Sequence, residues 1–502
     1  MANILVFDIG TSSMRGILYN HHGKILFKKQ IKYAQSYLKN RMVEQSPADW
    51  ENGLLEITRV MTSSSQTKNS PIDAISLTSQ RSSLIPLDSN GTPLHNAIMW
   101  QDKRTNSICD KLKDVETEVY KLTGLTINPI YTAPKISWLK QQKPQIYKKT
   151  FKFSTIHDYI LHLITGKFVT DHSIASRTLL FNINTLQWDK TLLSYFDIDG
   201  NKLNDSVEPG SICGSVSKTF ANISGLKEGI PVVSAGGDQQ CAVLGMNILT
   251  KDKLQVNTGT GSFIVTCTDR PVFDKKMRVS CNVSAIPGKY TIEAGIPTTG
   301  TIYRWFNENF YQCTDNIDCA FDRINIDASA SPVGANELIV LPHFEGRGAP
   351  YFNALGKGIF FNVTLSTEKC DFVRAILEGV CAEIQENVQV IQELVGSIPQ
   401  VLVSGGLSAF DLFNQIQADM YRKNVSCYQN KEATALGAWI SCAKTLGLYE
   451  SYQSAFKSAT QNLFQKTFSP IEENALIYDT LKTRRKKLYD SLVSVDIYSI
   501  FQ

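Results

Sequence analysis

The stretch ILVFDIGTSSMRGILYN, residues 4–20, decides the fold of this chain. The apolar run ILVF reads as a buried strand, the Gly, Thr and Ser residues form a turn, and RGILYN resumes as a second strand. HHG then predicts a hairpin turn and KILFKKQIKYA a third strand, so the chain opens with an antiparallel meander. The same order of strand, turn and strand returns in KLQVNTGTGSFIVTC, residues 253–267. This recurrence predicts an internal duplication.

Helix and strand signals alternate between the two meanders and again after the second. SPADWENGLLEITRVM begins with a Ser cap and a Pro and continues with helical spacing, and IDAISLTS reads as a strand. Later, the helix DFVRAILEGVCAEIQENVQVIQEL leads into the strand and turn QVLVSGG and the helix AFDLFNQIQADMY. We therefore expect an α/β fold with lobes at residues 1–248 and 249–502. The late basic run TRRKKLYD predicts a solvated helix face.

Composition sets the broad class. A chain of 502 residues is too long for one ordinary core, and 43% hydrophobic with 20% charged residues is typical of globular proteins. A net charge of +4 argues against a nucleic-acid binder. The eleven cysteines include no CxxC pair, which predicts reduced thiols without a zinc site. ILVFDIG is too short for a signal peptide, and no membrane span is evident. We expect a cytoplasmic protein without nucleic-acid or membrane partners.

The first turn carries groups that suit a polyphosphate. Backbone N–H groups and the hydroxyls of Thr11, Ser12 and Ser13 can converge on an anion at the tip of a strand–turn–strand unit. Asp8 would repel phosphate unless a cation lay between them, so it indicates Mg²⁺. The Gly259-Thr260-Gly261 turn supplies a second set of such groups. Neither turn matches the P-loop or the dinucleotide-binding fingerprint.

A second chemical motif is VVSAGGDQQCAVLG, in which Gly236 and Gly237 precede Asp238. The glycines allow a close backbone approach, and the carboxylate is delivered at the tip of a strand. There it can accept the proton of an attacking hydroxyl and help to hold a metal ion. A helix-capping aspartate is the alternative interpretation. The adjoining glycines and the following Gln239 favour catalysis.

Together these motifs resemble the FGGY carbohydrate kinases, an ATP-binding branch of the actin-like superfamily. The similarity spans roughly residues 3–450. Several segments are most similar to glycerol kinases, and xylulokinase-like and autoinducer-2-kinase-like members are also similar. The further segments that carry the resemblance, in order, are NAIMWQDKRT (96–105), VTDHSIASRTLLFNINTLQWD (169–189), GRGAPYF (346–352), FVRAILEGV (372–380) and KEATALGAW (431–439).

The resemblance implies two actin-like, ribonuclease H-like ATPase lobes, with mixed sheets flanked by helices and the active site in the interlobe cleft. It implies an ATP-dependent kinase acting on a hydroxyl of a small sugar or polyol, with Asp238 as catalytic base. Asp8 and Asp238 would hold Mg²⁺. The residues implied for ATP are Thr11, Ser12, Ser13, Arg15, Gly259, Thr260, Gly300, Gly405 and Gly406. Those implied for the substrate are Arg81, Ser82, Trp100, Tyr131, Asp238, Gln239 and Phe263.

Departures from the glycerol kinase pattern bear on the substrate. Those enzymes carry an Arg-Glu pair where this chain has Arg81-Ser82, and a Tyr where it has Ile130. Tyr131 could replace the missing Tyr only if the loop shifts. Substrate hydroxyls left unpaired cost about 1–3 kcal/mol each, and the smaller side chains leave room. We predict a pentulose such as xylulose; glycerol or another short polyol, an autoinducer-2-like dihydroxy ketone and gluconate stay open.

An alternative from another class is a nucleotide-switched binding or filament protein, since actin and the Hsp70 chaperones share the phosphate turns. That interpretation predicts neither an arginine beside an aromatic wall nor the AGGDQQ strand end, and this chain has both. The sequence leaves a homodimer open.

Overall fold

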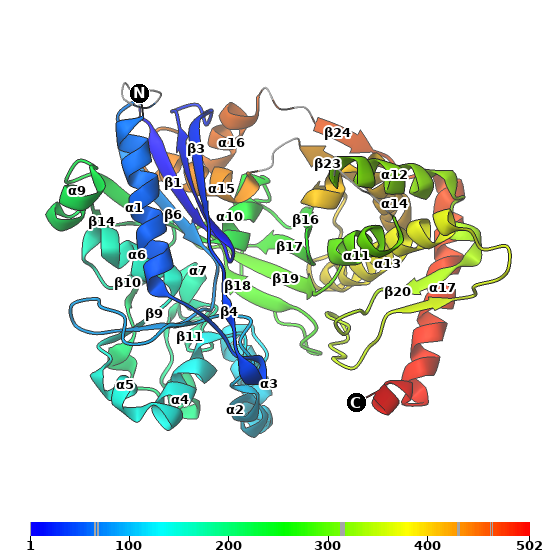
Figure 1. The fold of residues 1–502 in the computed structure, drawn as a ribbon, viewed down its shortest axis with the longest axis horizontal. Coiled ribbons are helices and arrows are strands. Elements are labelled where there is room, and N and C mark those ends of the chain that lie inside the picture. The colour runs from blue at the N-terminus through cyan, green and yellow to red at the C-terminus, as the bar shows by residue number, and fades with distance from the viewer. Residues whose placement is uncertain are drawn as a thin grey trace. The chain divides into compact units, whose positions relative to one another are not determined.

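The structure is a computed structural model that describes residues 2–64, 67, 70–311, 317–428, 432–461, 463 and 465–501. Its chain divides into two compact units (Figure 1). Unit 1 comprises Met1–Leu249, Cys267–Thr291 and Glu432–Asn462, and unit 2 comprises Thr250–Thr266, Ile292–Lys431 and Leu463–Gln502. The sequence assigned everything after residue 248 to the second lobe, whereas two later segments belong to unit 1.

Unit 1 is built on a six-stranded sheet of order β14-β15-β6-β1-β2-β3. Strands β1, β2 and β3 form the predicted antiparallel meander, and β6 and β15 run parallel to β1. Its strands are β1 (Ile4–Ile9), β2 (Ser13–Tyr19), β3 (Ile25–Lys32), β4 (Ser36–Tyr37), β5 (Val43–Gln45), β6 (Ala74–Ser79), β7 (Ile85–Leu87), β8 (Ala97–Ile98), β9 (Lys152–Ser154), β10 (Val169–Asp171), β11 (Phe181–Asn182), β12 (Gln187–Trp188), β13 (Asp205–Val207), β14 (Ile212–Ser215), β15 (Pro231–Gly237) and β18 (Ser280–Val283). Its helices are α1 (Pro47–Ser63), α2 (Asn106–Lys111), α3 (Glu116–Thr123), α4 (Thr132–Gln142), α5 (Pro144–Lys149), α6 (Ile156–Thr165), α7 (His172–Ala175), α8 (Lys190–Tyr195), α9 (Lys218–Ser224), α10 (Asp238–Gly245), α15 (Ala433–Thr445) and α16 (Tyr452–Thr460).

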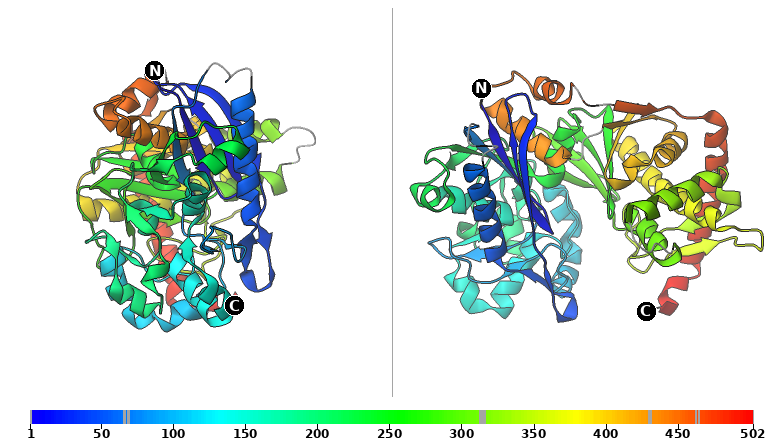
Figure 2. Two further views of the ribbon diagram at one scale, coloured as in Figure 1. Left: turned by 90° about the vertical axis from the view of Figure 1, so that its left-hand side faces the viewer. Right: turned by 45° about the horizontal axis from the view of Figure 1, so that its top comes forward.

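Helix α1 covers part of one face of this sheet. It begins at Pro47, directly after Ser46, as the sequence predicted, because proline is favoured in the first turn of a helix. Its apolar residues recur at helical spacing and are fully or almost fully buried against β2 and β3 (Figures 1 and 2). Burying each such side chain contributes about 1.5–3 kcal/mol. These residues are Trp50, Leu54, Ile57 and Met61.

Helices α10 and α15 pack against each other in unit 1 through facing glycines. A side chain at Gly245 would lie 1.9 Å from the carbonyl oxygen of Ala433, and one at Gly437 would lie 1.8 Å from that of Cys241. The two backbones therefore touch. Helix α15 also contacts β1, β6 and β15, so a segment late in the sequence fixes the helix that begins at Asp238.

Unit 2 repeats the strand order of unit 1. Six strands of a seven-stranded sheet run in the order β24-β23-β22-β16-β17-β19, with β16 antiparallel to β17 and parallel to β22. This order matches β14-β15-β6-β1-β2-β3, which confirms the predicted duplication. Its strands are β16 (Lys253–Thr258), β17 (Ser262–Thr268), β19 (Tyr290–Ile296), β20 (Ile339–Leu341), β21 (Ile359–Phe361), β22 (Gln400–Ser404), β23 (Asn424–Tyr428) and β24 (Gln465–Phe468). Its helices are α11 (Gly300–Phe310), α12 (Ile317–Ala330), α13 (Lys369–Val395), α14 (Asp411–Tyr421) and α17 (Glu472–Ser494), and the chain passes between the units within β17 and β19.

Helix α17 corrects one sequence prediction. Its basic run was expected to face solvent, and Arg484 and Lys486 are indeed exposed. Arg485 is instead buried, because its guanidinium pairs with Glu383 and Glu386 of α13. A buried arginine is retained only where carboxylates compensate its charge, and the sequence spacing of α13 and α17 does not reveal that pairing.

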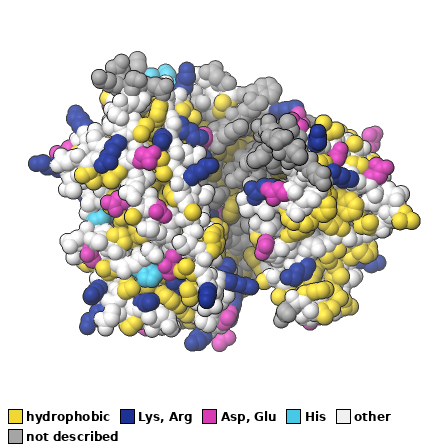
Figure 3. Space-filling view, viewed as in Figure 1, with side chains coloured by type: hydrophobic (Ala, Val, Ile, Leu, Met, Phe, Trp, Pro, Cys, Tyr) yellow, Lys and Arg dark blue, Asp and Glu magenta, His cyan; other side chains and the backbone are white. Residues whose placement is uncertain are grey.

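The surface and the thiols of the described residues have the following features. On the viewed face of unit 1, charged side chains of both signs are interspersed, and hydrophobic side chains gather on that of unit 2 (Figure 3). Within the described part of the chain, no helix is both long and apolar enough to cross a membrane. Nine cysteines are free thiols. Cys313, the side chain of Cys319 and Lys431 lie outside the described residues.

Candidate active site

The carboxyl ends of three parallel strands bring the unit 1 candidates together. Ile9 at the end of β1 pairs with Ser79 of β6, and Ser79 pairs with Gly237 of β15. Residues that follow these strands therefore emerge at one edge of the sheet, which is where open α/β sheets bind ligands. Asp8, the segment Gln80-Arg81-Ser82 and Asp238 all lie at this edge.

Asp238 is the first residue of α10 and follows a bulged strand end. Gly236 has φ +117°, and the register of β15 shifts there, which turns the chain into the helix. The Asp238 Oδ1 accepts a hydrogen bond from the Gln239 backbone N–H at 2.7 Å and lies 3.3 Å from Arg81 Nε. Its side chain is 27% exposed, so the carboxylate is oriented by protein groups and still reachable by a ligand.

Arg81 is held against the same strand end. A side chain at Gly237 would lie 2.7 Å from Arg81 Cδ, so only glycine lets the arginine stem lie across the strand. The Arg81 guanidinium also donates to Gln240 Oε1 at 3.2 Å. The Gly-Gly sequence before Asp238 is thus needed for arginine packing as well as for the turn.

Asp8 sits in a buried charge network. It is 2% exposed and pairs with Arg15, which also donates to Glu432 at 2.9 Å. Lys28 forms a further ion pair with Glu432. Burial is the main cause that raises the pKa of Asp8 to about 6; Arg15 opposes the rise, and the Asp238 and Glu432 carboxylates add to it. The effect of Asp238 on this pKa means that the two carboxylates are electrostatic neighbours.

This carboxylate pair fits Mg²⁺. The described residues contain no group of three or more His, Cys, Asp or Glu side chains that could hold a metal ion. Mg²⁺ needs no such group, because it keeps several waters and binds one or two carboxylates together with substrate phosphates. The mutual repulsion that raises the pKa of Asp8 is what a divalent cation between Asp8 and Asp238 would relieve.

The first Gly-Thr-Ser turn has the predicted form. The Gly10 N–H donates to the Ser13 carbonyl at 2.9 Å, which closes the turn between β1 and β2. Trp100 Nε1 donates to Thr11 Oγ1 at 3.1 Å, so the indole lies beside the turn, and Ser12 is exposed at its tip. The turn therefore offers hydroxyls next to Asp8 and Trp100.

The loop that carries Tyr131 is held from beneath by a buried lysine. Lys135 is 0% exposed, and its Nζ donates to the carbonyls of Pro129 (2.9 Å), Ile130 (2.7 Å) and Tyr131 (2.9 Å). The Tyr131 ring lies 5.0 Å from the Arg177 guanidinium carbon. Ser82 has φ +70° and donates from Oγ to the Arg177 carbonyl at 3.1 Å. Ser82 and Tyr131 thus meet at Arg177.

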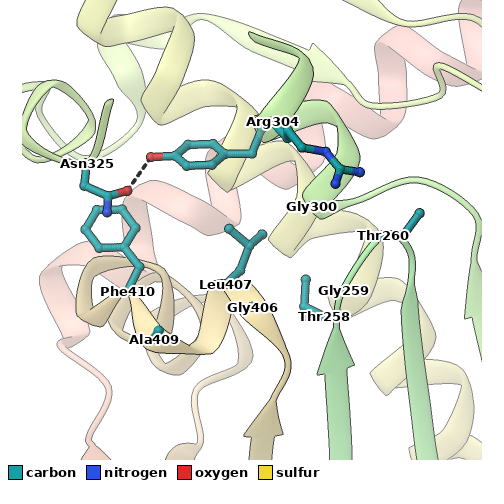
Figure 4. A pocket seen from close by; sticks show the side chains of 11 residues that line it. Thr258, Gly259, Thr260, Gly300, Arg304, Asn325, Gly406, Leu407, Ala409 and Phe410 are labelled. Carbon is teal, nitrogen blue, oxygen red and sulfur yellow. Dashed lines mark hydrogen bonds between the residues drawn. The ribbon is translucent and has the colours of Figure 1, made fainter. Parts of the chain in front are cut away.

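In unit 2 the predicted glycines Gly259, Gly300 and Gly406 line a pocket of about 400 Å³ (Figure 4), whereas Gly405 is not among the described lining residues. Strands β16 and β22 are parallel neighbours, so the Gly259-Thr260-Gly261 turn and Gly405-Gly406 emerge at one edge of this sheet. Gly405 has φ +92°, and a side chain there would lie 2.4 Å from the Thr258 carbonyl oxygen. The described residues that line the pocket are Thr258, Gly259, Thr260, Gly300, Tyr303, Arg304, Asn325, Gly406, Leu407, Ala409 and Phe410.

Comparison with known protein families shows which family the chain belongs to. The N-terminal domain of the FGGY family of carbohydrate kinases matches residues 3–245, and its C-terminal domain matches residues 254–446. The chain belongs to the FGGY family of carbohydrate kinases. It is accordingly an ATP-dependent phosphotransferase built from two actin-like lobes, which excludes the alternative of a switched binding protein.

Individual FGGY relatives differ in the substrate that their names state. Glycerol kinase of Thermococcus onnurineus is 31% identical over 494 residues, covering 96% of this chain and 95% of its own. Xylulose kinase of Bacillus subtilis is 28% identical over 493 residues, covering 97% of each. The crystal structure of gluconate kinase from Lactobacillus acidophilus superposes with a TM-score of 0.92 at 25% identity, covering both chains fully. Xylulose is not favoured over glycerol by these likenesses.

The predicted site residues of this FGGY kinase are divided between the two units. Of the predicted substrate residues, Phe263 is in unit 2, where a side chain at Gly295 would meet its ring at 3.8 Å. The other six are in unit 1. Of the predicted ATP residues, Thr11, Ser12, Ser13 and Arg15 are in unit 1, and Gly259, Thr260, Gly300, Gly405 and Gly406 are in unit 2.

Several residues at the candidate sites were not predicted from the sequence. Glu432 falls within the KEATALGAW segment, but its pairing with Arg15 and Lys28 depends on α15 returning to unit 1. Tyr303 and Arg304 follow Gly300 by about one helical turn, so the glycine could have pointed to them. Asn325 lies on α12, which carries no recognisable motif, and only the fold brings it to the pocket.

Proposed function

We propose that this kinase transfers the γ-phosphoryl group of ATP to a primary hydroxyl of a small sugar or polyol, with Asp238 as the general base. The observation that carries the proposal is the position of Asp238 at the strand edge, beside Arg81 and near Asp8. Asp238 accepts the hydroxyl proton, the freed oxygen attacks the γ-phosphorus, and the bond to the β-phosphate oxygen breaks to release ADP.

The surroundings of Asp238 suit this role. Its position at the start of α10 places the carboxylate at the positive end of the helix dipole, which favours a negative charge there. Arg81 Nε at 3.3 Å fixes its orientation. When bound, Mg²⁺ would be held by Asp8 and Asp238 and would neutralise charge on the transferred phosphate.

For the nucleotide, we propose the pocket of unit 2 as the binding site. The Thr260 hydroxyl and the backbone at Gly406 can meet phosphate oxygens, and the positive end of the α11 dipole lies at Gly300, whose own N–H donates to the Gly259 carbonyl at 3.0 Å. A side chain at Gly300 would lie 2.3 Å from the Gly259 carbonyl oxygen, so the helix start and the turn are in contact. For Thr11, Ser12, Ser13 and Arg15 of unit 1, we keep the proposal that they bind phosphate, which rests on the family resemblance.

For the substrate, we propose a five-carbon ketose rather than glycerol. Ser82 stands where glycerol kinases have a carboxylate, and its hydroxyl already donates to the Arg177 carbonyl. Tyr131 is 5% exposed with its ring against Arg177, and Ile130 is aliphatic. The site therefore keeps Arg81, Trp100 and Gln239 for the reacting end and offers less to the hydroxyls of a three-carbon chain. Substrates whose hydroxyls stay unpaired are discriminated against.

A coupled ADP-release assay tests both parts of this proposal. The panel contains glycerol, erythritol, xylulose, ribulose, gluconate and the dihydroxy-ketone precursor of autoinducer-2, with Asp238→Asn as the blank. We expect kcat/KM for xylulose or ribulose to exceed that for glycerol. If glycerol gives the highest value, Tyr131 serves in place of the missing tyrosine and the ketose assignment is wrong.

A further inference from the structure

The pocket of unit 2 has two chemically distinct ends (Figure 4). Gly259, Thr260 and Gly300 lie at one end, where backbone and hydroxyl groups suit phosphate. Asn325 and Phe410 lie at the opposite end, with Leu407 between. On the proposed function, the phosphates occupy the first end, so the nucleobase falls at the second.

The second end offers one oriented amide between apolar walls. Tyr303 is 1% exposed, and its hydroxyl lies 2.7 Å from Asn325 Oδ1. Burial raises the pKa of Tyr303 well above its ordinary value, so the phenol stays protonated and donates to Oδ1. An amide whose oxygen is engaged in this way presents its nitrogen, which has two N–H donors, to other partners.

The rest of this end suits a flat aromatic ring. Phe410, Leu407 and Ala409 supply apolar surface beside Asn325. Among the described residues that line the pocket there is no carboxylate, and the other hydrogen-bonding side chains besides Asn325 and Tyr303 are Thr258, Thr260 and Arg304. In Figure 4 the two threonines lie at the phosphate end, and the Arg304 side chain extends toward Gly300 and Thr260.

We infer that Asn325 is the residue that recognises the nucleobase, donating from Nδ2 to an acceptor nitrogen of a purine that lies against Phe410, with Tyr303 as the positioning residue. This inference rests on the proposed assignment of the pocket to the nucleotide. It names a residue on α12 that no sequence motif indicates.

Asn325→Asp separates recognition from a structural role. The carboxylate keeps an oxygen for the Tyr303 hydroxyl but has no N–H to donate, so the packing of α12 on α11 is retained and the base contact is lost. We expect the Kd for ADP, measured by calorimetry on the full chain, to rise at least about tenfold, in line with the loss of one oriented hydrogen bond and the added charge. The sugar KM and the melting temperature should not change.

Two controls exclude a general effect of negative charge. Ser329→Asp adds the same charge at an exposed position of the same helix and should leave the Kd for ADP unchanged. Inorganic pyrophosphate has no base, so its binding should be equally strong in the natural protein and in Asn325→Asp. An unchanged ADP affinity in Asn325→Asp, or an equal loss for pyrophosphate, overturns the inference.

A third variant distinguishes failure of this inference from failure of the nucleotide assignment. Ala409→Trp fills the pocket and should abolish ADP binding. If ADP still binds to Ala409→Trp, the pocket is not the nucleotide site, and both the assignment of the pocket and the role of Asn325 are wrong. If Ala409→Trp abolishes binding while Asn325→Asp binds normally, only the role of Asn325 is wrong.

Discussion

At the scale of single residues, the proposed reaction depends on the Asp238 carboxylate. Asp238→Asn keeps the shape and the contacts to Gln239 N–H and Arg81 but removes the basic oxygen. We expect kcat to fall at least ~10²-fold, the lower range for a general base, with the melting temperature unchanged. Steady-state kinetics and a thermal melt check this. Turnover close to that of the natural protein would remove Asp238 from the mechanism.

At the scale of single elements, two glycines of unit 2 with the same φ angle test whether the edge of its sheet binds the nucleotide. Gly405 and Gly396 both have φ +92°, so alanine at either position carries a similar backbone cost of about 1–2 kcal/mol. Only at Gly405 would the new side chain meet a neighbour, the Thr258 carbonyl oxygen at 2.4 Å. We expect Gly405→Ala to raise the Kd for ADP at least about tenfold through this clash, and Gly396→Ala to leave it unchanged. Equal affinities in the two variants would contradict the assignment of this edge to the nucleotide.

Helix α4 and the loop before it, which carries Tyr131, allow a second prediction at the scale of an element. Lys135→Met removes the donor to one buried and two partly buried carbonyls, and a buried carbonyl left unsatisfied costs about 1–3 kcal/mol. Because these carbonyls belong to the loop that carries Tyr131, we expect the sugar KM to rise more than the ATP KM, together with a lower melting temperature. Lys140→Met, on the exposed side of the same helix, is the control and should change neither KM. A parallel rise in both KM values would mean that the loop does not serve the sugar site.

Lys135 also predicts a pH dependence. Burial lowers the pKa of Lys135 to about 7, against 10.5 in an unfolded chain. Below pH 7 the Lys135 side chain is protonated in both the folded and the unfolded chain. Between pH 7 and 10.5 the unfolded chain still holds this proton while the folded chain has released it. The free energy of unfolding therefore rises with pH over this range. The natural protein should therefore gain unfolding free energy relative to Lys135→Met between about pH 7 and 9. Denaturant titrations at several pH values measure this difference, and a flat or opposite trend would show that the ammonium stays charged.

At the scale of the whole molecule, unit 1 needs a segment from the far end of the chain. Helix α15 contacts β1, β6 and β15, and its Ala438 carbonyl accepts from Ser76 Oγ at 2.7 Å. We expect a fragment of residues 1–249 to lack a cooperative unfolding transition, because it exposes the sheet surface that α15 covers. In the full chain, Gly437→Val should lower the melting temperature, since its side chain would meet the Cys241 carbonyl. Cooperative unfolding of the fragment alone would contradict this account.

The sequence by itself determined the features that are local in the chain. The meanders, their Gly-Thr turns, the strand end before Asp238 and the duplication all follow from hydrophobic patterning and turn residues within short windows. Family likeness in several motifs extended this to the ATP and substrate residues. Asp8 and Asp238 could be singled out because they lie near the end of a strand with a clear apolar pattern, whereas Arg81 was assigned only through the family resemblance.

Only the tertiary structure decided which distant segments meet. The return of α15 to unit 1, the pairing of Glu432 with Arg15, the burial of Arg485 and the arrival of Asn325 at the pocket all join residues far apart in the chain. Their sequence neighbourhoods look like ordinary helices, because helical periodicity states which face is apolar and not which partner it meets. The partner is set by burial, charge compensation and close backbone approach in three dimensions, and these depend on the whole fold.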